Sequence, residues 1–149
     1  MRSLWLGLSL FSSSLFAAPE IVDPKIRILP PGTPNTAVYF TLKNDSDNAL
    51  VITEVQGDFA KKFEIHNHIM KDGMMRMTKQ ASVEVPAKSS VTFAPGGLHV
   101  MVFGLQQPLT RLDPVTFQLI TDKGEEINVV ALPVSPAEEA SSHSHHYHD

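Results

Sequence analysis

Short apolar runs separated by turn residues make up most of the chain. The runs are rich in Val, Ile, Thr and Phe, and turn sequences such as Asp72-Gly73 and Lys123-Gly124 lie between them. This pattern is typical of β-strands, and no stretch keeps a helical period. The expected strands are 37–42, 50–55, 62–69, 82–85, 90–93, 99–103, 115–121 and 127–132. We therefore predict an all-β fold, an antiparallel β-sandwich with Greek-key connections.

The segment before the first of these strands is rich in proline. Five prolines lie between residues 18 and 34. Because proline donates no backbone hydrogen bond, it is confined in sheets to edges and bulges. We therefore expect an extended lead-in here, with at most a short edge strand at 26–29.

The N-terminus has the layout of a secretory signal peptide. A basic start with Arg2 is followed by an apolar run from Leu4 to Phe11 and then by small residues. The apolar run is too short to span a membrane. We therefore expect residues 1–17 to be a signal peptide that is cleaved after Ala17, and the mature protein to have no membrane span.

The remaining chain fits one domain followed by a polar tail. The protein has 149 residues, of which 42% are hydrophobic, enough for one packed core. We expect this domain over residues 18–134. Residues 135–149 are dominated by Ala, Glu, Ser and His, and we predict that they form a disordered tail.

Charge and cysteine content narrow the possible functions. Twelve Lys and Arg against 16 Asp and Glu give a formal net charge of −4, without a basic stripe, so nucleic acid is not an expected partner. The chain has no cysteine. This absence excludes a disulfide framework, thiolate catalysis and a blue-copper centre, which needs a Cys sulfur on the metal.

Histidine and methionine cluster together in the body of the chain. The cluster contains His66, His68, His99, Met70, Met74, Met75, Met77 and Met101. Because side chains alternate in direction along a strand, His66 and His68 should point away from the apolar face of their strand, and His99 and Met101 should share a face of theirs. Two simpler explanations are core packing for the methionines and ordinary hydrogen bonding for the histidines. Neither explains why the two residue types occur together, so we favour a metal site.

The donor types indicate which metal this would be. Thioether sulfur and neutral imidazole together suit Cu(I), whereas hard cations prefer oxygen ligands. A neutral ligand set leaves the charge of the ion uncompensated and its exchange feasible, which is typical of a carrier. Met70, Met74 and Met75 are explained equally well by packing or by a soft rim for partner contact, so we do not count them as ligands.

The spacing of these residues resembles the signature of a known family. His66, ten intervening residues, Met77, twenty-one intervening residues and then His99-Val100-Met101 is similar to the motif of the PCuAC family of periplasmic copper chaperones. Glu64-Ile65 before His66 and Pro95-Gly96-Gly97-Leu98 before His99 match as well. The strong part of the resemblance covers residues 63–109.

The resemblance implies a cupredoxin-like sandwich and a Cu(I) site formed by His66, Met77, His99 and Met101. It also implies a periplasmic protein that delivers copper toward the copper centre of cytochrome c oxidase. The expected partner is the oxidase subunit that carries copper, or another copper-assembly protein. We expect a monomeric binding protein and no enzymatic activity.

One position departs from the family, and the tail adds further donors. Many members carry Met where this chain has His68, so His68 is a candidate auxiliary ligand, above all for Cu(II). The tail contributes candidates for a secondary Cu(II) site, namely His143, His145, His146 and His148. An alternative function is copper or zinc storage or tolerance through this tail. A copper oxygenase with an N-terminal histidine is disfavoured, because the expected mature start is Ala18.

Overall fold

The computed structural model describes residues 17–142, and within them ten strands and one short helix. The elements are β1 (Glu20–Arg27), β2 (Thr36–Asn44), β3 (Leu50–Gly57), β4 (Ala60–Lys71), β5 (Met74–Lys79), β6 (Val83–Val85), β7 (Ser89–Phe93), β8 (His99–Leu105), β9 (Val115–Thr121), β10 (Glu126–Val134) and α1 (Pro136–Ser142). The predicted all-β fold is confirmed. The expected signal peptide lies outside the described residues except for its last position.

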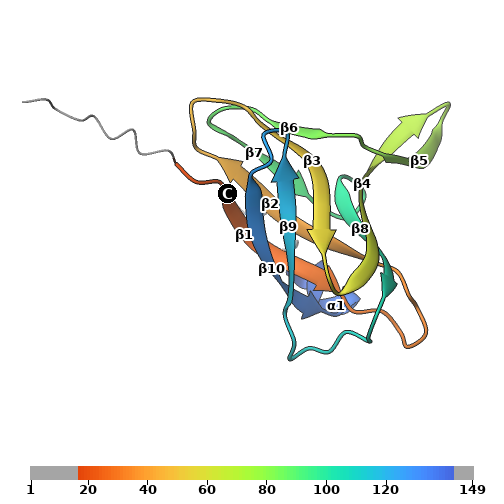
Figure 1. Cartoon of the computed structure of the whole chain (residues 1–149). Helices are drawn as coiled ribbons and strands as arrows, with labels where there is room; N and C mark the ends of the chain where they lie inside the picture. Colours follow the sequence, from red (N-terminus) through yellow and green to blue (C-terminus); the bar gives the residue numbers. More distant parts are fainter. Residues whose placement is uncertain (1–16, 143–149) are drawn as a thin grey trace, which may run out of the picture.

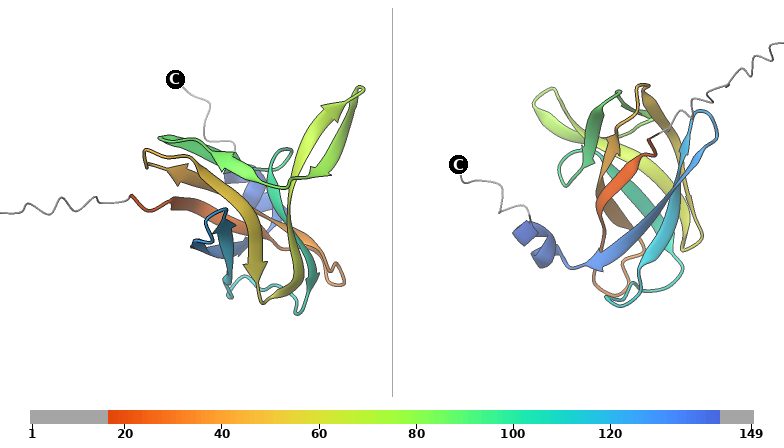
Figure 2. Two further views of the ribbon diagram at one scale, coloured as in Figure 1. Left: turned by 45° about the horizontal axis from the view of Figure 1, so that its top comes forward. Right: turned by 90° about the vertical axis from the view of Figure 1, so that its left-hand side faces the viewer.

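The strands form two facing layers (Figures 1 and 2). The first layer has the order β5-β4-β8-β2-β1, and β7 pairs with the half of β2 that β8 does not reach. The second layer has the order β10-β9-β3-β6. The layers join where β1 pairs with β10 in parallel orientation, so the sandwich is antiparallel except at this one described junction.

The core fills the space between the layers. Val38, Phe40 and Leu42 alternate along β2 with more exposed residues, and they are at most 3% exposed. Phe40 contacts Phe117 of the opposite layer, with ring centroids 6.3 Å apart. The period-two pattern of the sequence therefore places one face of each central strand in the core, and the other face is available for function.

The proline-rich lead-in differs from the prediction of a short edge strand. β1 is paired on both sides, with β2 and β10, and Ile26 is completely buried. Pro24 is tolerated because it lies at a bulge, where the register shifts between Val22 and Lys25 and Asp23 has a positive φ of 51°. At this irregular point the missing N–H removes no regular hydrogen bond of the sheet.

The tail also differs from the prediction over its first residues. The segment expected to be disordered from residue 135 contains the helix α1. Ser135 and Glu138 form a capping box, in which the Glu138 carboxylate accepts hydrogen bonds from the backbone N–H and hydroxyl of Ser135, both at 2.8 Å. Glu139 then anchors the helix to the sheet through an ion pair with Arg27 at 2.8 Å. The four tail histidines lie outside the described residues.

No helix in the described residues 17–142 is long and apolar enough to cross a membrane.

Candidate metal centre

Strand register brings the predicted site residues onto neighbouring strands. In the antiparallel pairing of β4 with β8, His66 lies directly opposite His99, and Glu64 lies opposite Met101. In the pairing of β4 with β5, His68 lies opposite Met77. Directly opposite residues share a face of the sheet, so all five candidate donors of the body lie on one face.

This face is the outer face of the first layer. Ile65, Val100 and Val102, which alternate with the candidate donors, are at most 4% exposed and belong to the core. The alternation that places them in the core forces His66, His99 and Met101 to point outward. His66, His68, His99 and Met101 are thus held on the inner strands β4 and β8, and Met77 lies on the edge strand β5. None of the five lies on a loop.

His99 is oriented and kept neutral by its surroundings. The side chain is only 4% exposed, and its Nδ1 donates a hydrogen bond to the backbone carbonyl of Gly97 at 2.9 Å. Burial lowers the pKa of His99 below its ordinary value of 6.5, although the bond to Gly97 acts in the opposite direction. A neutral imidazole with its proton on Nδ1 has its free lone pair on Nε2, where a metal can bind.

His66 has the opposite arrangement of its two ring nitrogens. Its Nε2 lies 2.8 Å from the Glu64 carboxylate. Because a carboxylate can only accept, Nε2 carries the proton in this contact. Nδ1 is buried, and no group in the described part of the chain hydrogen-bonds to it. In the neutral imidazole this buried nitrogen carries a free lone pair, which is costly to desolvate unless a ligand uses it.

Glu64 is the positioning residue of this pair, and sequence reasoning assigned it no role. Hydrogen bonds from His66 and then from Lys79 lower the pKa of Glu64 to about 2. Lys79 lies 3.1 Å and Lys62 3.3 Å from the same carboxylate oxygen. Glu64 is therefore an anion at neutral pH. A carboxylate on the outer nitrogen of a metal-binding histidine fixes the ring and increases its basicity.

The two thioethers lie diagonally from His66, on either side of it. Met101 lies opposite Glu64, and Met77 lies opposite His68. Diagonal neighbours in a sheet are about 7–8 Å apart at Cα, within reach of the long and flexible Met side chain. Met101 is half-buried, whereas Met77 is 51% exposed. The structure therefore unites His66 with His99 and keeps both methionines one residue pair away.

His68 lies beside the pair of histidines. Its ring centroid is 5.2 Å from that of His99, and the His66 and His99 centroids are 6.0 Å apart. Within residues 17–142, no three His, Cys, Asp or Glu side chains converge closely enough to hold a metal by themselves. The candidate set of two imidazoles and two thioethers is of a different composition and fits a soft ion.

Tyr39 and Arg27 continue the same outer face beyond His99. The Tyr39 ring centroid lies 6.4 Å from that of His99, and the Arg27 guanidinium lies over the Tyr39 ring at 5.2 Å. Burial raises the pKa of Tyr39, so its hydroxyl stays protonated. Arg27 in turn pairs with Glu139 of α1, and the start of the tail is thereby anchored on the side of the sheet that carries the histidines.

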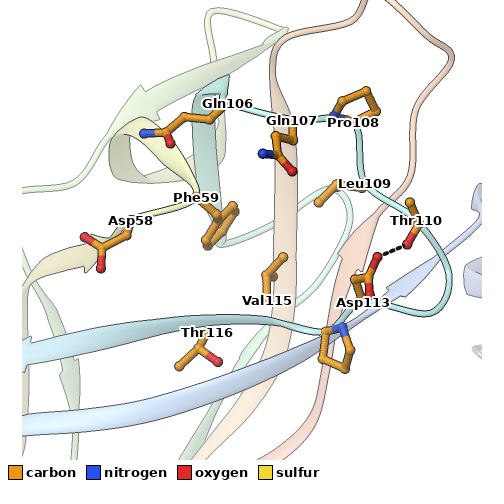
Figure 3. Close-up of a pocket in the computed structure, with 11 residues that line it drawn as sticks. Asp58, Phe59, Gln106, Gln107, Pro108, Leu109, Thr110, Asp113, Val115 and Thr116 are labelled. Atoms are coloured by element: carbon orange, nitrogen blue, oxygen red, sulfur yellow. Dashed lines mark hydrogen bonds between the residues drawn. The ribbon is translucent and has the colours of Figure 1, made fainter.

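A cavity of the described chain lies away from these residues. It has a volume of about 540 Å³ and is lined by residues such as Asp58, Phe59 and Gln106 from the loops that precede β4 and follow β8 (Figure 3). His66 and His99 lie toward the other ends of these two strands. The lining carries no histidine or methionine, and its Asp113 accepts a hydrogen bond from the Thr110 hydroxyl. The cavity therefore offers none of the donors of the site.

The fold and the outward His/Met face define a cupredoxin-like β-sandwich domain with a candidate soft-metal site. The chain belongs to the family described as "Putative lipoprotein LpqE-like", whose model matches residues 20–134. This match covers every strand of the sandwich.

Two curated proteins each match about two thirds of this chain. The chain is 29% identical over 104 residues to "Putative lipoprotein Lxx21020" of Leifsonia xyli. This alignment covers 69% of this chain and 62% of that protein. The chain is also 28% identical over 108 residues to "Uncharacterized protein RP573" of Rickettsia prowazekii. This second alignment covers 68% of this chain and 58% of that protein. The matches thus span less than two thirds of the length of each relative.

Solved PCuAC domains share the fold. The copper-bound PCuAC domain from PmoF2 aligns with a TM-score of 0.68 and 20% identity, over 81% of this chain and 96% of that domain. The solution structure of CuI-DR1885 from Deinococcus radiodurans aligns with a TM-score of 0.58 and 26% identity, over 76% of this chain and 77% of that one. These likenesses confirm the predicted cupredoxin-like sandwich and the resemblance to the PCuAC family.

Proposed function

We propose that this protein is a copper carrier that binds Cu(I) through His66, Met77, His99 and Met101. The observation that carries the proposal is the pair of facing histidines, each with one nitrogen bound to a protein acceptor. Their other nitrogens, Nδ1 of His66 and Nε2 of His99, are left as donors. Two fixed imidazole donors flanked by two thioethers match the preference of Cu(I) for nitrogen and soft sulfur ligands.

The relatives support the choice of copper. The PCuAC domain from PmoF2 is described as copper-bound, and DR1885 was solved with Cu(I). The same fold carries the His/Met spacing in this chain. Copper is here the cargo, and the ligands supply neutral donors without a charged group that would hold the ion permanently.

The unequal exposure of the ligands supports a role in exchange. His99 is buried, whereas Met77 lies on β5, whose six residues are all exposed. A ligand on an exposed strand can be displaced by a donor from a partner without opening the core. We infer that Met77 is the ligand released first when copper is transferred.

The test is an anaerobic Cu(I) titration in competition with bicinchoninate. We expect one tightly held ion per chain. Met77→Leu should weaken its binding about tenfold, which is about 1.4 kcal/mol. Met74→Leu is a matched control, because Met74 is exposed to a similar degree on the same strand but opposite Lys71, on the other face. A wild-type protein that does not hold Cu(I), or equal effects of the two substitutions, would refute the proposal.

The destination and location of the carrier belong to the same proposal. We propose export to the periplasm through the signal peptide 1–17, and delivery of Cu(I) to the cytochrome c oxidase subunit that carries copper. Mass spectrometry of the exported protein should give Ala18 as the first residue. Mixing the loaded monomer with the copper-free soluble domain of that subunit should transfer the ion, and copper that stays on the carrier would argue against this recipient.

His68 and the tail histidines remain candidates for a secondary Cu(II) site. Deleting residues 143–149 separates a carrier from a storage protein that relies on its tail. We expect the deletion variant to retain one tightly bound Cu(I) and to lose weaker Cu(II) sites. Loss of all tight binding would instead favour storage or tolerance through the tail.

A further inference from the structure

The β4–β5 hairpin projects beyond the body of the sandwich (Figure 1). It carries several exposed methionines. Met70, Met74 and Met75 are 66%, 57% and 59% exposed. Burying a Met side chain contributes about 1.5–3 kcal/mol, and these side chains forgo most of that gain. The structure therefore removes the packing explanation that the sequence left open for them.

The register of the hairpin sorts these methionines by face. Met70 lies directly opposite Met75, two positions along from the pair of His68 with Met77. Positions two apart on a strand share a face, so Met70 and Met75 lie on the face of the candidate metal centre. Met74 lies opposite Lys71, on the other face.

The turn fixes this register. Asp72 and Gly73 have φ values of 53° and 74°, which fits a two-residue type I′ turn. Such a turn permits a single pairing of the flanking strands, whereas a slip by one residue would move every side chain to the opposite face. The facing of Met70 and Met75 is therefore a property of the fold and not of a flexible end.

The charges of the hairpin are sorted in the same way. Lys71 and Arg76 alternate with the site-facing residues, and both lie on the other face. On the site face, the positions beyond Lys79 carry imidazole and thioether donors, in the order His68 with Met77 and then Met70 with Met75. Among the described residues, the cation of the paired hairpin segment on this face is Lys79, next to Met77, and it is paired with Glu64 at 3.1 Å. Met70 and Met75 therefore have no Lys or Arg of the hairpin beside them on this face.

We propose that Met70, Met75 and Met77 form a second, solvent-facing Cu(I) position next to the primary site. This inference rests on the proposed function in its choice of ion. Three thioethers supply soft, uncharged donors that need no deprotonation, which suits Cu(I) and disfavours Zn²⁺ or Ca²⁺. Because Met77 belongs to both sets, an ion at the hairpin lies beside the primary site, where a partner can reach it.

The test is an anaerobic titration of the full mature chain with Cu(I), followed by NMR of ¹³C-labelled methionine methyl groups. The first equivalent should shift the resonances of Met77 and Met101. Further Cu(I) should shift those of Met70 and Met75 and leave that of Met74 unchanged. The Met70→Leu, Met75→Leu double variant should lose the hairpin response and keep the first equivalent, and Met74→Leu should keep both.

The outcomes separate this inference from the proposed function. Resonances of Met70 and Met75 that stay unchanged, while those of Met77 and Met101 shift, would overturn the hairpin position alone. Unchanged resonances of Met77 and Met101 would overturn the primary site, whatever the hairpin does. Equal shifts of Met74 and Met75 would show nonspecific thioether binding and would also overturn the hairpin position. The Met→Leu substitutions at positions 70, 74 and 75 should not unfold the protein, because these methionine side chains are largely exposed.

Discussion

Glu64→Gln tests whether the carboxylate behind His66 prepares that histidine for metal binding. In the wild-type protein, Glu64 accepts a hydrogen bond from the Nε2–H of His66 at 2.8 Å and also pairs with Lys79 and Lys62. Glutamine preserves the size of the side chain and an oxygen that can accept the same hydrogen bond. It removes the negative charge, and with it the increase in basicity of the donor nitrogen.

The expected loss of metal affinity follows from the removal of the charge while the hydrogen-bond acceptor is kept. Removing a group that orients a metal-binding histidine reduces metal affinity about 10- to 100-fold. Because glutamine still orients the ring, we expect the lower end, about tenfold, or ~1.4 kcal/mol. Glu64→Ala removes both charge and acceptor and should approach the upper end. The assay is the competition titration with bicinchoninate, and Glu84→Gln, an exposed change in the other layer, is the control.

The pKa of Glu64 extends this prediction to two pH values. The carboxyl titrates at about 2, below its ordinary 4.5, so it is fully charged at both about pH 5.5 and about pH 7.5. The Glu64 charge is therefore present at both pH values, and the loss of affinity in Glu64→Gln is expected at both. An unchanged affinity in Glu64→Gln, or an equal loss in Glu84→Gln, would refute the positioning role.

Three further predictions concern folding and pH. Arg27→Ala should lower the free energy of unfolding by about 1.5–3 kcal/mol in urea, because its ion pair with Glu139 is largely shielded from solvent. Arg111→Ala should cost at most about 1 kcal/mol, since its pair of equal length is exposed. Equal effects would contradict this reasoning. The lowered pKa of His99 means that its contribution to stability is complete above pH 6.5 and is lost as the pH falls below that value. The urea concentration at the unfolding midpoint should therefore decrease when the pH is lowered from about 7.5 to about 5.5, and this decrease should be smaller in His99→Gln. An equal decrease in both proteins would exclude His99 as the cause. Phe117→Ala should cost about 3–5 kcal/mol, because the ring is completely buried between the layers; a loss below about 1 kcal/mol would show that the core collapses around the cavity.

Strand periodicity in the sequence determined the sandwich and the face of the candidate site. The alternation of Ile65 with His66, and of Val100 with His99 and Met101, corresponds to the core and outer faces in the structure. This succeeds because the alternation of side chains is a local property of any strand, and burial of one face then fixes the direction of the other.

Secondary-structure elements that lack a characteristic pattern in their own sequence were not predicted correctly. β5 was not predicted, because all its residues are exposed and no apolar alternation marks it. β1 was predicted as at most a short edge strand, because the bulge that accommodates Pro24 becomes apparent only once β2 and β10 flank it. Helix α1 depends on its capping box and on the distant Arg27, and a composition rich in Ala, Glu and Ser conceals both.

The sequence by itself therefore determined the fold class, the outer face of β4 and β8, and the chemical type of the candidate donors. Tertiary structure decided which nitrogen of each histidine is free, because that depends on Glu64 and Gly97 as hydrogen-bond partners. It also decided that Met70 faces Met75 in the open, since exposure and cross-strand register are properties of the assembled sheet. The chemical type of each donor is set by the residue itself. The geometry and solvation that allow these donors to bind a metal arise only when segments distant in the sequence pack together.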